Sequence, residues 1–314
     1  MVSAVNPRIF EVMHPDEIKH KKVLLSPLNW GYGHVSRSTG LIDQLLRNHN
    51  QVVIACDSDQ KDIYLEYFPD LSYVDHLGYP FKFKGKGTFA IDLILSWSKL
   101  KKRLKSEIKE VENMVEEYRP DIIISDHRYG FYSEKVPSIF VTHQYNLPVK
   151  WYQRMGDKVH KKLMNKFNYV WIMDKADNSL AGKLSATNDS KAIYIGPYSR
   201  FSLYDIPSEK TIDKLAVISG PKVYAQQFAD WVVKMHPDAL VVCDDLIELP
   251  KTITRISGSW KHQDAKILET KHLISRSGYS TIMDAVTLNV EATCIPTPGQ
   301  AEQIYLANRF KYSD

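Results

Sequence analysis

The chain has 314 residues, of which 44% are hydrophobic and 25% are charged, and its formal net charge is +4. This length exceeds one core of ordinary size and predicts two domains. No run approaches the ~18 consecutive apolar residues of a membrane-spanning helix. The first 22 residues contain charges and prolines where a signal peptide has an unbroken apolar segment, so we expect a cytoplasmic protein. The mild positive charge suits anionic ligands such as nucleotide diphosphates and is too weak to indicate nucleic-acid binding.

Short β-branched runs alternate with amphipathic stretches along the chain. The predicted strands are 22–26, 51–56, 121–125, 138–142, 169–173, 214–219, 239–243, 252–256, 272–275 and 292–296. The predicted helices include 36–47, 92–118, 152–167, 224–235, 281–288 and 301–312. Continuous apolar strands alternating with helices predict parallel sheets that are covered on both faces. The sequence therefore predicts an α/β protein with two doubly wound, Rossmann-like domains that face a cleft.

An irregular segment, 196–208, separates the two series of elements and contains a glycine and two prolines. We place the boundary there, with an N-terminal domain of residues 1–200 and a short C-terminal domain of residues 201–314. The three cysteines, Cys56, Cys243 and Cys294, lie in or at the end of apolar runs, and their spacings fit no metal site. We interpret them as structural residues.

The first predicted strand ends in a glycine-rich loop, NWGYGHVSRS (residues 29–38). Gly31 and Gly33 allow a sharp turn and a close approach of a ligand, and the helix that follows offers free backbone N–H groups. A plain turn between strand and helix would explain the glycines, but it would not explain His34 at the mouth of the loop. The loop lacks the third glycine of a dinucleotide-binding motif and the Gly-Lys-Ser/Thr of a phosphate-binding P-loop.

A second loop, SRSGYSTIMDAV (residues 275–286), also follows a strand and opens a helix. Gly278 frees the turn, while Ser277 and Thr281 can cap the helix or donate to phosphate oxygens. Asp284 lies about one turn into the helix, where a carboxylate can accept hydrogen bonds from a ribose diol. A solvated carboxylate on the helix surface is the alternative for Asp284.

A third loop, PTPGQAEQIYLAN (residues 296–308), places Gln300, Glu302 and Gln303 at the start of another helix. Ligands bind at the carboxyl ends of parallel strands, so we expect this loop and the second loop to line the same crevice.

Together these motifs resemble the MurG-type glycosyltransferases, the peptidoglycan N-acetylglucosaminyltransferases and their relatives with the two-domain GT-B fold. SRSGYSTIMDAV followed by PTPGQAEQIYLAN is similar to the donor-nucleotide half of that superfamily, and NWGYGHVSRS is similar to its glycine-rich loop. The resemblance implies that Ser277 and Gly278 face the diphosphate, Asp284 the ribose, and Gln303 and its neighbours the donor sugar. It also implies that His34 lies near the acceptor and the sugar C1 atom.

Three features depart from the pattern of the family. The glycine-rich donor loop of the C-terminal domain is here only Ser219-Gly220-Pro221-Lys222. In the last motif of the family an asparagine usually precedes an alanine, whereas this chain has Ala307-Asn308. The C-terminal domain is also short, so either the chain is a shortened form or the domain closure differs.

Polar residues also follow two strands in the middle of the chain. Asp126 and His127 end one predicted strand, and His143 ends the next. We expect His127 and His143 to lie on the acceptor side of the cleft, as we do Gly31, Gly33 and Arg37. Asp126 could equally cap a turn.

The pair Asp57 and Asp59 imitates a metal-binding DxD motif. We interpret Asp59 instead as the N-cap of a helix, and we expect no metal. Without a metal, helix N-terminal amides and Arg276 would stabilise the leaving nucleotide.

Two stretches, 94–105 and 150–166, combine many basic residues with tryptophan. Such helices can rest on anionic lipid, which would place the protein peripherally on the inner face of the membrane. Solvated helix faces are the alternative.

The sequence therefore predicts an inverting, metal-independent glycosyltransferase of cytoplasmic location. It would move a hexosyl or N-acetylhexosaminyl group from a nucleoside diphosphate, expected to be a UDP-sugar, to an acceptor that the sequence does not name. The nucleotide-sugar is a substrate, and no cofactor is expected. His34 is the expected base, with Asp126 as the second candidate. The donor residues would be Gly220, Arg276, Ser277, Gly278, Thr281, Asp284, Gln300, Glu302 and Gln303.

Two alternatives stay open. One is a nucleotide-sugar hydrolase of the same fold, in which water replaces the acceptor. The other is a catalytically silent protein that binds a sugar nucleotide.

Overall fold

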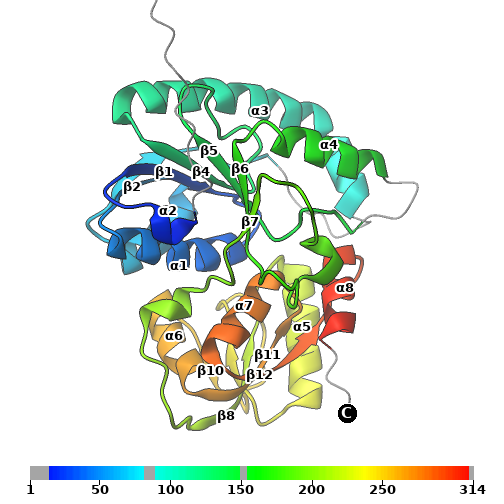
Figure 1. Ribbon diagram of the computed structural model, residues 1–314. Helices are drawn as coiled ribbons and strands as arrows, with labels where there is room; N and C mark the ends of the chain where they lie inside the picture. Colours follow the sequence, from blue (N-terminus) through cyan, green and yellow to red (C-terminus); the bar gives the residue numbers. More distant parts are fainter. Residues whose placement is uncertain (1–13, 81–88, 149–153, 311–314) are drawn as a thin grey trace, which may run out of the picture.

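The computed structural model describes residues 14–80, 89–148 and 154–310, except for the side chains of 89–97 and 154. It contains two parallel β-sheets, each with helices on its faces (Figure 1). The start of the predicted helix 152–167 and the end of the predicted helix 301–312 lie outside these ranges, as do the basic residues around 150.

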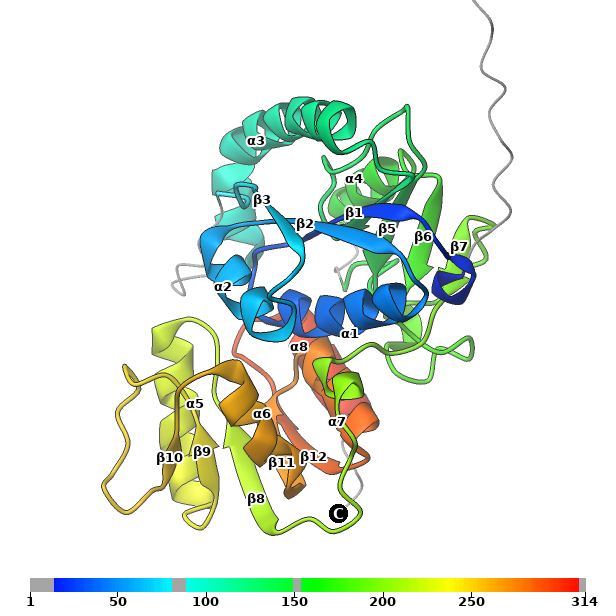
Figure 2. The ribbon, with the colours of Figure 1, turned by 90° about the vertical axis from the view of Figure 1, so that its left-hand side faces the viewer.

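The first sheet has seven strands in the order β3-β2-β1-β4-β5-β6-β7. All of its pairings are parallel, and β1 lies between β2 and β4. The strands are β1 (Lys22–Pro27), β2 (Gln51–Cys56), β3 (Ser72–Asp75), β4 (Ile122–Asp126), β5 (Ser138–Thr142), β6 (Tyr169–Ile172) and β7 (Ala192–Tyr194). Its helices are α1 (Gly33–Arg47), α2 (Ser58–Tyr67), α3 (Phe89–Tyr118) and α4 (Arg154–Met164). Figure 2 shows α1 and α3 on opposite faces of this sheet, with α1 on the side of the second domain.

The second sheet has five strands in the order β10-β9-β8-β11-β12, again all parallel. Its strands are β8 (Ile212–Val217), β9 (Leu240–Val242), β10 (Arg255–Ile256), β11 (Thr270–Arg276) and β12 (Glu291–Ile295). Its helices are α5 (Lys222–Met235), α6 (Trp260–Leu268), α7 (Tyr279–Leu288) and α8 (Ala301–Arg309). These two doubly wound sheets confirm the predicted fold class.

The two domains share one apolar cluster. Leu41 and Ile42 of α1 belong to the same buried cluster as Ile282 and Met283 of α7 and Leu306 of α8. Burial of apolar side chains favours association, so these helices hold the domains in contact.

The central strands were predicted because both of their faces are buried. β4 and β5 are buried at every residue, and the sequence shows this burial as the apolar runs Ile122–Ile124 and Ile139–Val141. The edge strands β3 and β7 are short and partly exposed, so they carry no such run and were missed. The short helix α6 was missed as well.

Several helices begin a few residues earlier than predicted, among them α3 at Phe89 and α5 at Lys222. Helix α1 begins at Gly33 and not at Ser36, so His34 lies in its first turn. Helix α7 begins at Tyr279, two residues earlier than predicted. Helix α2 is capped by Asp57, which accepts a hydrogen bond from the backbone N–H of Gln60, so the prediction that Asp59 is the N-cap was wrong. In the described part of the chain, no helix is long and apolar enough to cross a membrane.

Candidate functional site

The candidate site lies where the strand order of each sheet reverses. In the first sheet α1 follows β1, and β4 lies beside β1. In the second sheet α7 follows β11, which lies beside β8. Parallel sheets bind ligands in the crevice at such points. The two first turns also approach one another, because a Cβ atom on Gly33 would lie 2.5 Å from the Oγ of Ser280. A side chain at position 33 would therefore displace the hydroxyl of Ser280.

His34 and Asp126 form a hydrogen-bonded pair at this point. Nδ1 of His34 lies 2.9 Å from Oδ2 of Asp126, which is 1% exposed at the end of β4. Burial and the adjacent Arg37 lower the pKa of His34, although Asp126 acts in the opposite direction. Burial alone would raise the pKa of Asp126, but Arg37 and His34 outweigh it and hold that pKa well below its usual value. A neutral histidine next to an ionised carboxylate can act as a general base.

Arg37 lies one turn after His34 and contacts three side chains of the site. Its Nε and one terminal nitrogen donate to the two carboxylate oxygens of Asp126. The same terminal nitrogen lies 2.9 Å from Nδ1 of His34, and the other lies 3.0 Å from Nδ1 of His143. Arg37 was expected on the acceptor side of the cleft, but in the structure its guanidinium is buried and bound to protein groups.

His143 connects the two domains. Its Nε2 lies 2.7 Å from Oε1 of Glu302 on α8, and its ring stacks on Tyr279 of α7 at a centroid distance of 4.2 Å. Burial would raise the pKa of Glu302, but His143 outweighs it and lowers that pKa. His143 and Glu302, which the sequence analysis assigned to the acceptor and donor sides, are therefore in direct contact.

His127 lies directly after Asp126 and adopts a left-handed backbone with φ of 62°. This turn allows Asp126 to face His34 while Arg128 enters the core, where it donates to Glu107. The ring of His127 lies against those of His34 and His160, and its buried Nδ1 has no hydrogen-bond partner among the described residues. Burial lowers the pKa of His127 well below its usual value, which keeps the ring neutral.

The helices of the cleft differ from α2 and α6 at their N-termini. Among the described residues, no side chain caps α1, α5, α7 or α8. By contrast, Asp57 caps α2 and Ser259 caps α6. The four uncapped helices follow β1, β8, β11 and β12, and the loops before α1 and α5 turn through Gly31 and Gly220 at φ of 115° and 100°. Uncapped first turns present free N–H groups and a positive dipole end, which suit an anion.

Several predicted donor residues are engaged inside the C-terminal domain. The hydroxyl of Ser277 is buried and donates to the carbonyl of Gln303, whose own side chain accepts from the backbone of Thr297. Arg276 donates to the carbonyls of Pro296 and Tyr224. Ligand contacts by the side chains of Ser277, Gln303 and Arg276 would therefore require these bonds to break. Gly278 and Gln300 occupy the N-cap positions of α7 and α8, and Thr281 lies in the first turn of α7. The ligand roles of all these residues stay predictions.

Asp284 belongs to a second buried group, here called the hinge cluster, on the opposite side of the first turn of α1. It accepts hydrogen bonds from Ser36, Ser199 and Arg200, and Arg200 also donates to Asp264 at 2.6 Å. The cluster consists of Ser36, Tyr67, Ser199, Arg200, Tyr204, Asp264 and Asp284. The side chain of Asp284 is 13% exposed, so the solvated-surface alternative does not hold. Its predicted ribose contact would compete with these hydrogen bonds.

The hinge cluster could hardly be predicted from the sequence. Arg200 and Asp264 lie in an irregular segment and in a helix that was not predicted, and they are 64 residues apart. Tyr67, which donates to Asp264, is distant from both. One weak signal was available, which is that Arg200 lies in the polar segment at the predicted domain boundary.

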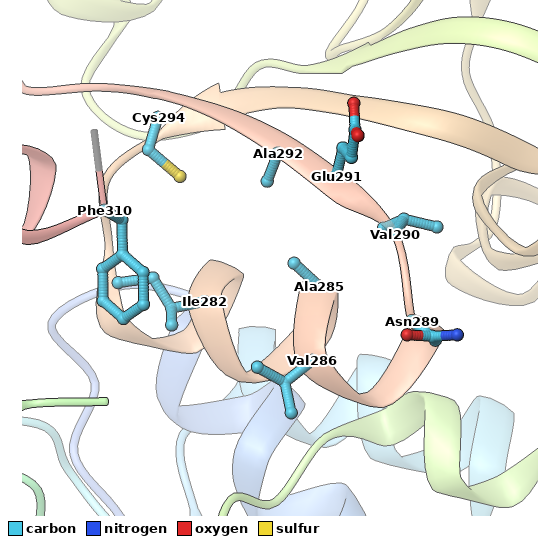
Figure 3. Close-up of a pocket in the computed structure, with 9 residues that line it drawn as sticks. All are labelled: Ile282, Ala285, Val286, Asn289, Val290, Glu291, Ala292, Cys294 and Phe310. Atoms are coloured by element: carbon cyan, nitrogen blue, oxygen red, sulfur yellow. The ribbon is translucent and has the colours of Figure 1, made fainter. Parts of the chain in front are cut away.

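Two hollows lie outside the cleft. One, of about 360 Å³, lies between α7 and β12 and is lined mainly by apolar side chains, including Ile282, Val286 and Phe310 (Figure 3). The other, of about 520 Å³, lies between the second half of α1 and the segment 195–202. Neither is lined by any of the predicted site residues. The described residues include no group of three or more His, Cys, Asp or Glu side chains that could hold a metal ion, and metal independence stays a prediction.

Comparisons with known proteins show the fold. No family model matches the chain, and no curated protein is similar to it in sequence. The glycotransferase of kitacinnamycin superposes with a TM-score of 0.59 at 16% identity, over 92% of this chain and 84% of that chain. The spinosyn rhamnosyltransferase SpnG, complexed with thymidine diphosphate, gives 0.58 at 14% identity, over 92% and 83%. The glycosyltransferase SnogD from Streptomyces nogalater gives 0.56 at 14% identity, over 93% and 85%. The chain therefore has the GT-B fold, and these similarities do not single out the MurG-like branch.

Proposed function

We propose that the chain transfers a sugar from a nucleoside diphosphate to an acceptor hydroxyl, with inversion at C1 and without a metal ion. The observation that carries this proposal is the pair formed by His34, in the first turn of α1, and Asp126, at the end of β4, opposite the uncapped first turn of α7. A base thereby faces an anion-binding helix terminus across the contact between the two domains.

The reaction follows from the geometry of this pair. Asp126 accepts the Nδ1 proton of His34, which leaves Nε2 free to take the proton of the acceptor hydroxyl. The hydroxyl oxygen forms a bond to C1 while the bond from C1 to the diphosphate oxygen breaks on the opposite face. Asp126 stabilises the imidazolium that forms, and the lowered pKa of His34 keeps the ring neutral beforehand.

The leaving diphosphate gains negative charge as its bond to C1 breaks. The free N–H groups of α5, α7 and α8 can donate to it without reorganisation. This role falls to the backbone because the guanidinium of Arg276 is bonded to two carbonyls.

A pyrimidine nucleotide is the donor that we propose. The sequence motifs resemble those of enzymes that use uridine donors, and SpnG binds thymidine diphosphate. SpnG is also known in complex with the spinosyn aglycone, which supports a separate acceptor molecule here as well.

The donor is tested by thermal shift with uridine, thymidine and adenosine diphosphates. A ligand that binds only the native state stabilises it by about 2.7 kcal/mol at 100 times its Kd. We expect the uridine or thymidine nucleotide to raise the Tm most, with the uridine nucleotide first. A shift with adenosine diphosphate that equals or exceeds both would contradict the proposal.

The reaction is tested by incubation of the protein with the donor so identified. We expect little free sugar without an acceptor, and sugar transfer once a suitable acceptor is found. Rapid release of free sugar in water would make the chain a hydrolase. Tight binding without any turnover in a broad acceptor screen would make it a binding protein.

We also propose that the basic surface of α3 and α4 contacts anionic lipid. Lys101, Lys102 and Lys105 of α3 are exposed, as are Lys158 and Lys162 of α4, beside a Met155 side chain that is 72% exposed. Co-sedimentation with vesicles that contain phosphatidylserine, lost at high salt, would support this contact. Equal recovery with neutral vesicles would exclude it.

A further inference from the structure

The proton positions around Arg37 follow from its chemistry. A guanidinium only donates hydrogen bonds, so Nδ1 of His143 must accept from it, and the proton of His143 must lie on Nε2, which donates to Glu302. His143 is therefore fixed in one tautomer between a residue of the N-terminal domain and a residue of the C-terminal domain.

His34 has no such unique assignment. Its Nδ1 lies 2.9 Å from Asp126, which only accepts, and 2.9 Å from a terminal nitrogen of Arg37, which only donates. A neutral imidazole nitrogen can satisfy one of these neighbours at a time. When Nδ1 carries the proton and donates to Asp126, Nε2 has a free lone pair and can act as a base. When Nδ1 accepts from Arg37, the proton is on Nε2, and the ring cannot take a proton there.

We propose that Arg37 is a positioning residue that competes with Asp126 for Nδ1 of His34, and that the contact of His143 with Glu302 holds Arg37 in the competing position. The inference rests on the proposed function in taking His34 as the base. The base form of His34 is then favoured only when Glu302 releases His143.

The structure supports a fixed position for Arg37. The guanidinium is anchored on one side by both oxygens of Asp126 and on the other by His143, whose ring is clamped between Glu302 and the face of Tyr279. Glu302 is 29% exposed, so a ligand hydroxyl that enters the cleft can replace His143 as its hydrogen-bond donor. When His143 no longer accepts from Arg37, the guanidinium keeps its bonds to Asp126 but loses its second anchor, and it can then turn about Asp126 so that its terminal nitrogen moves away from Nδ1 of His34. A ligand on the C-terminal domain would in this way prepare the base on the N-terminal domain.

The charged and titratable groups around His34 are few. Arg37 lies on α1, the same helix as His34. Asp126 and His127 come from the end of β4, and His143 comes from the end of β5. From the C-terminal domain, α7 contributes the uncharged Ser280, and α8 contributes Glu302 through His143.

The inference is tested by measuring the tautomer population and the pKa of His34 in the whole chain, by ¹⁵N NMR of the imidazole nitrogens. The signal is assigned by its loss in His34→Gln. We expect Glu302→Ala to increase the population with the proton on Nδ1 and to raise the pKa of His34 by about one unit, because Arg37 withdraws. Simple electrostatics predicts the opposite sign, since removal of a negative charge lowers the pKa of a nearby histidine. The matched control Glu291→Ala removes an exposed carboxylate of β12 and should change neither property.

A second pair of variants tests the anchor itself. Glutamine at position 143 offers an oxygen to Arg37 and an N–H to Glu302, so His143→Gln should keep the wild-type tautomer of His34. His143→Leu offers neither and should shift the tautomer as Glu302→Ala does. An unchanged or lowered pKa in Glu302→Ala, or identical behaviour of the two His143 variants, would overturn the inference. The measurement needs no substrate, so its outcome is separate from that of the donor screen and the transfer assay.

Discussion

The first turn of α1 separates two buried arginine–aspartate groups. On one side Arg37 and Asp126 lie beside His34, and on the other the hinge cluster joins Arg200 to Asp264 and Asp284. Both groups cross or adjoin the contact between the domains. The first group contains a histidine, whose ring can take up and release a proton, and the hinge cluster contains none.

This difference separates a structural group from a reactive one. In the hinge cluster the two carboxylates share one arginine, and hydroxyl groups satisfy further oxygens. Such a fully bonded network fixes the relative position of the elements that contribute to it. Beside Asp126, by contrast, His34 has two competing neighbours and a second ring nitrogen for a substrate.

The largest effect should follow from the loss of His34. We expect His34→Ala to reduce kcat by ~10²–10⁴-fold with little change in nucleotide affinity, because a base acts mainly in the transition state. His34→Gln should be almost as slow, since an amide cannot take the proton. Steady-state rates and calorimetry measure the two quantities.

The matched control is His272→Gln at the start of β11, where a histidine bonds Thr293 far along the strand from the cleft. It should keep wild-type turnover. If His34→Gln turns over within a few-fold of wild type, His34 serves only to stiffen the turn.

Substitutions in the hinge cluster should lower the stability of the fold and leave the chemical step unchanged. We expect Arg200→Met to lower the free energy of unfolding by about 3–5 kcal/mol, because it leaves two buried carboxylates without their cation. Urea unfolding measures this loss. Lys271→Met removes an exposed pair with Asp213 and should leave stability almost unchanged. Equal stabilities of the two variants would show that the buried network does not hold the domains.

Asp284 tests whether the two regions are separate, since it is a hinge residue that the sequence motif assigns to the ribose. We expect Asp284→Asn to weaken nucleotide binding by at most roughly 1.5–3 kcal/mol, as for a charged hydrogen bond. It should also lower the Tm, because Arg200 loses a charged partner. Calorimetry of the variant with the nucleotide from the screen measures the affinity. Unchanged affinity together with a lower Tm would assign Asp284 wholly to the hinge.

The features that could be predicted from the sequence are local ones, namely periodic apolar patterns and short loop motifs. The buried strands β4 and β5 appear as apolar runs, and the loops before α1 and α7 appear as glycines and hydroxyl residues after a strand. His34 and Asp126 were both expected as candidate bases, and the structure brings the two side chains into contact. Partners that depend on side-chain direction could not be predicted. The contact of His143 with Glu302 joins residues 159 positions apart, and the buried hydroxyl of Ser277 faces Gln303.

The smallest effect should be that of a chelator, for which we expect no loss of activity in EDTA. A metal ion in such an enzyme neutralises the leaving diphosphate, and the uncapped first turns of α5, α7 and α8 can supply that charge stabilisation from the backbone. The acidic pair Asp57 and Asp59, which imitates a metal motif, is explained by the cap that Asp57 makes on α2. Turnover is measured in EDTA and again after addition of magnesium or manganese, with Asp59→Asn as a second arm that leaves the cap intact. Activity that disappears in EDTA and returns with either metal would show that the helix termini do not suffice, and would reopen the assignment of the acidic residues at the cleft.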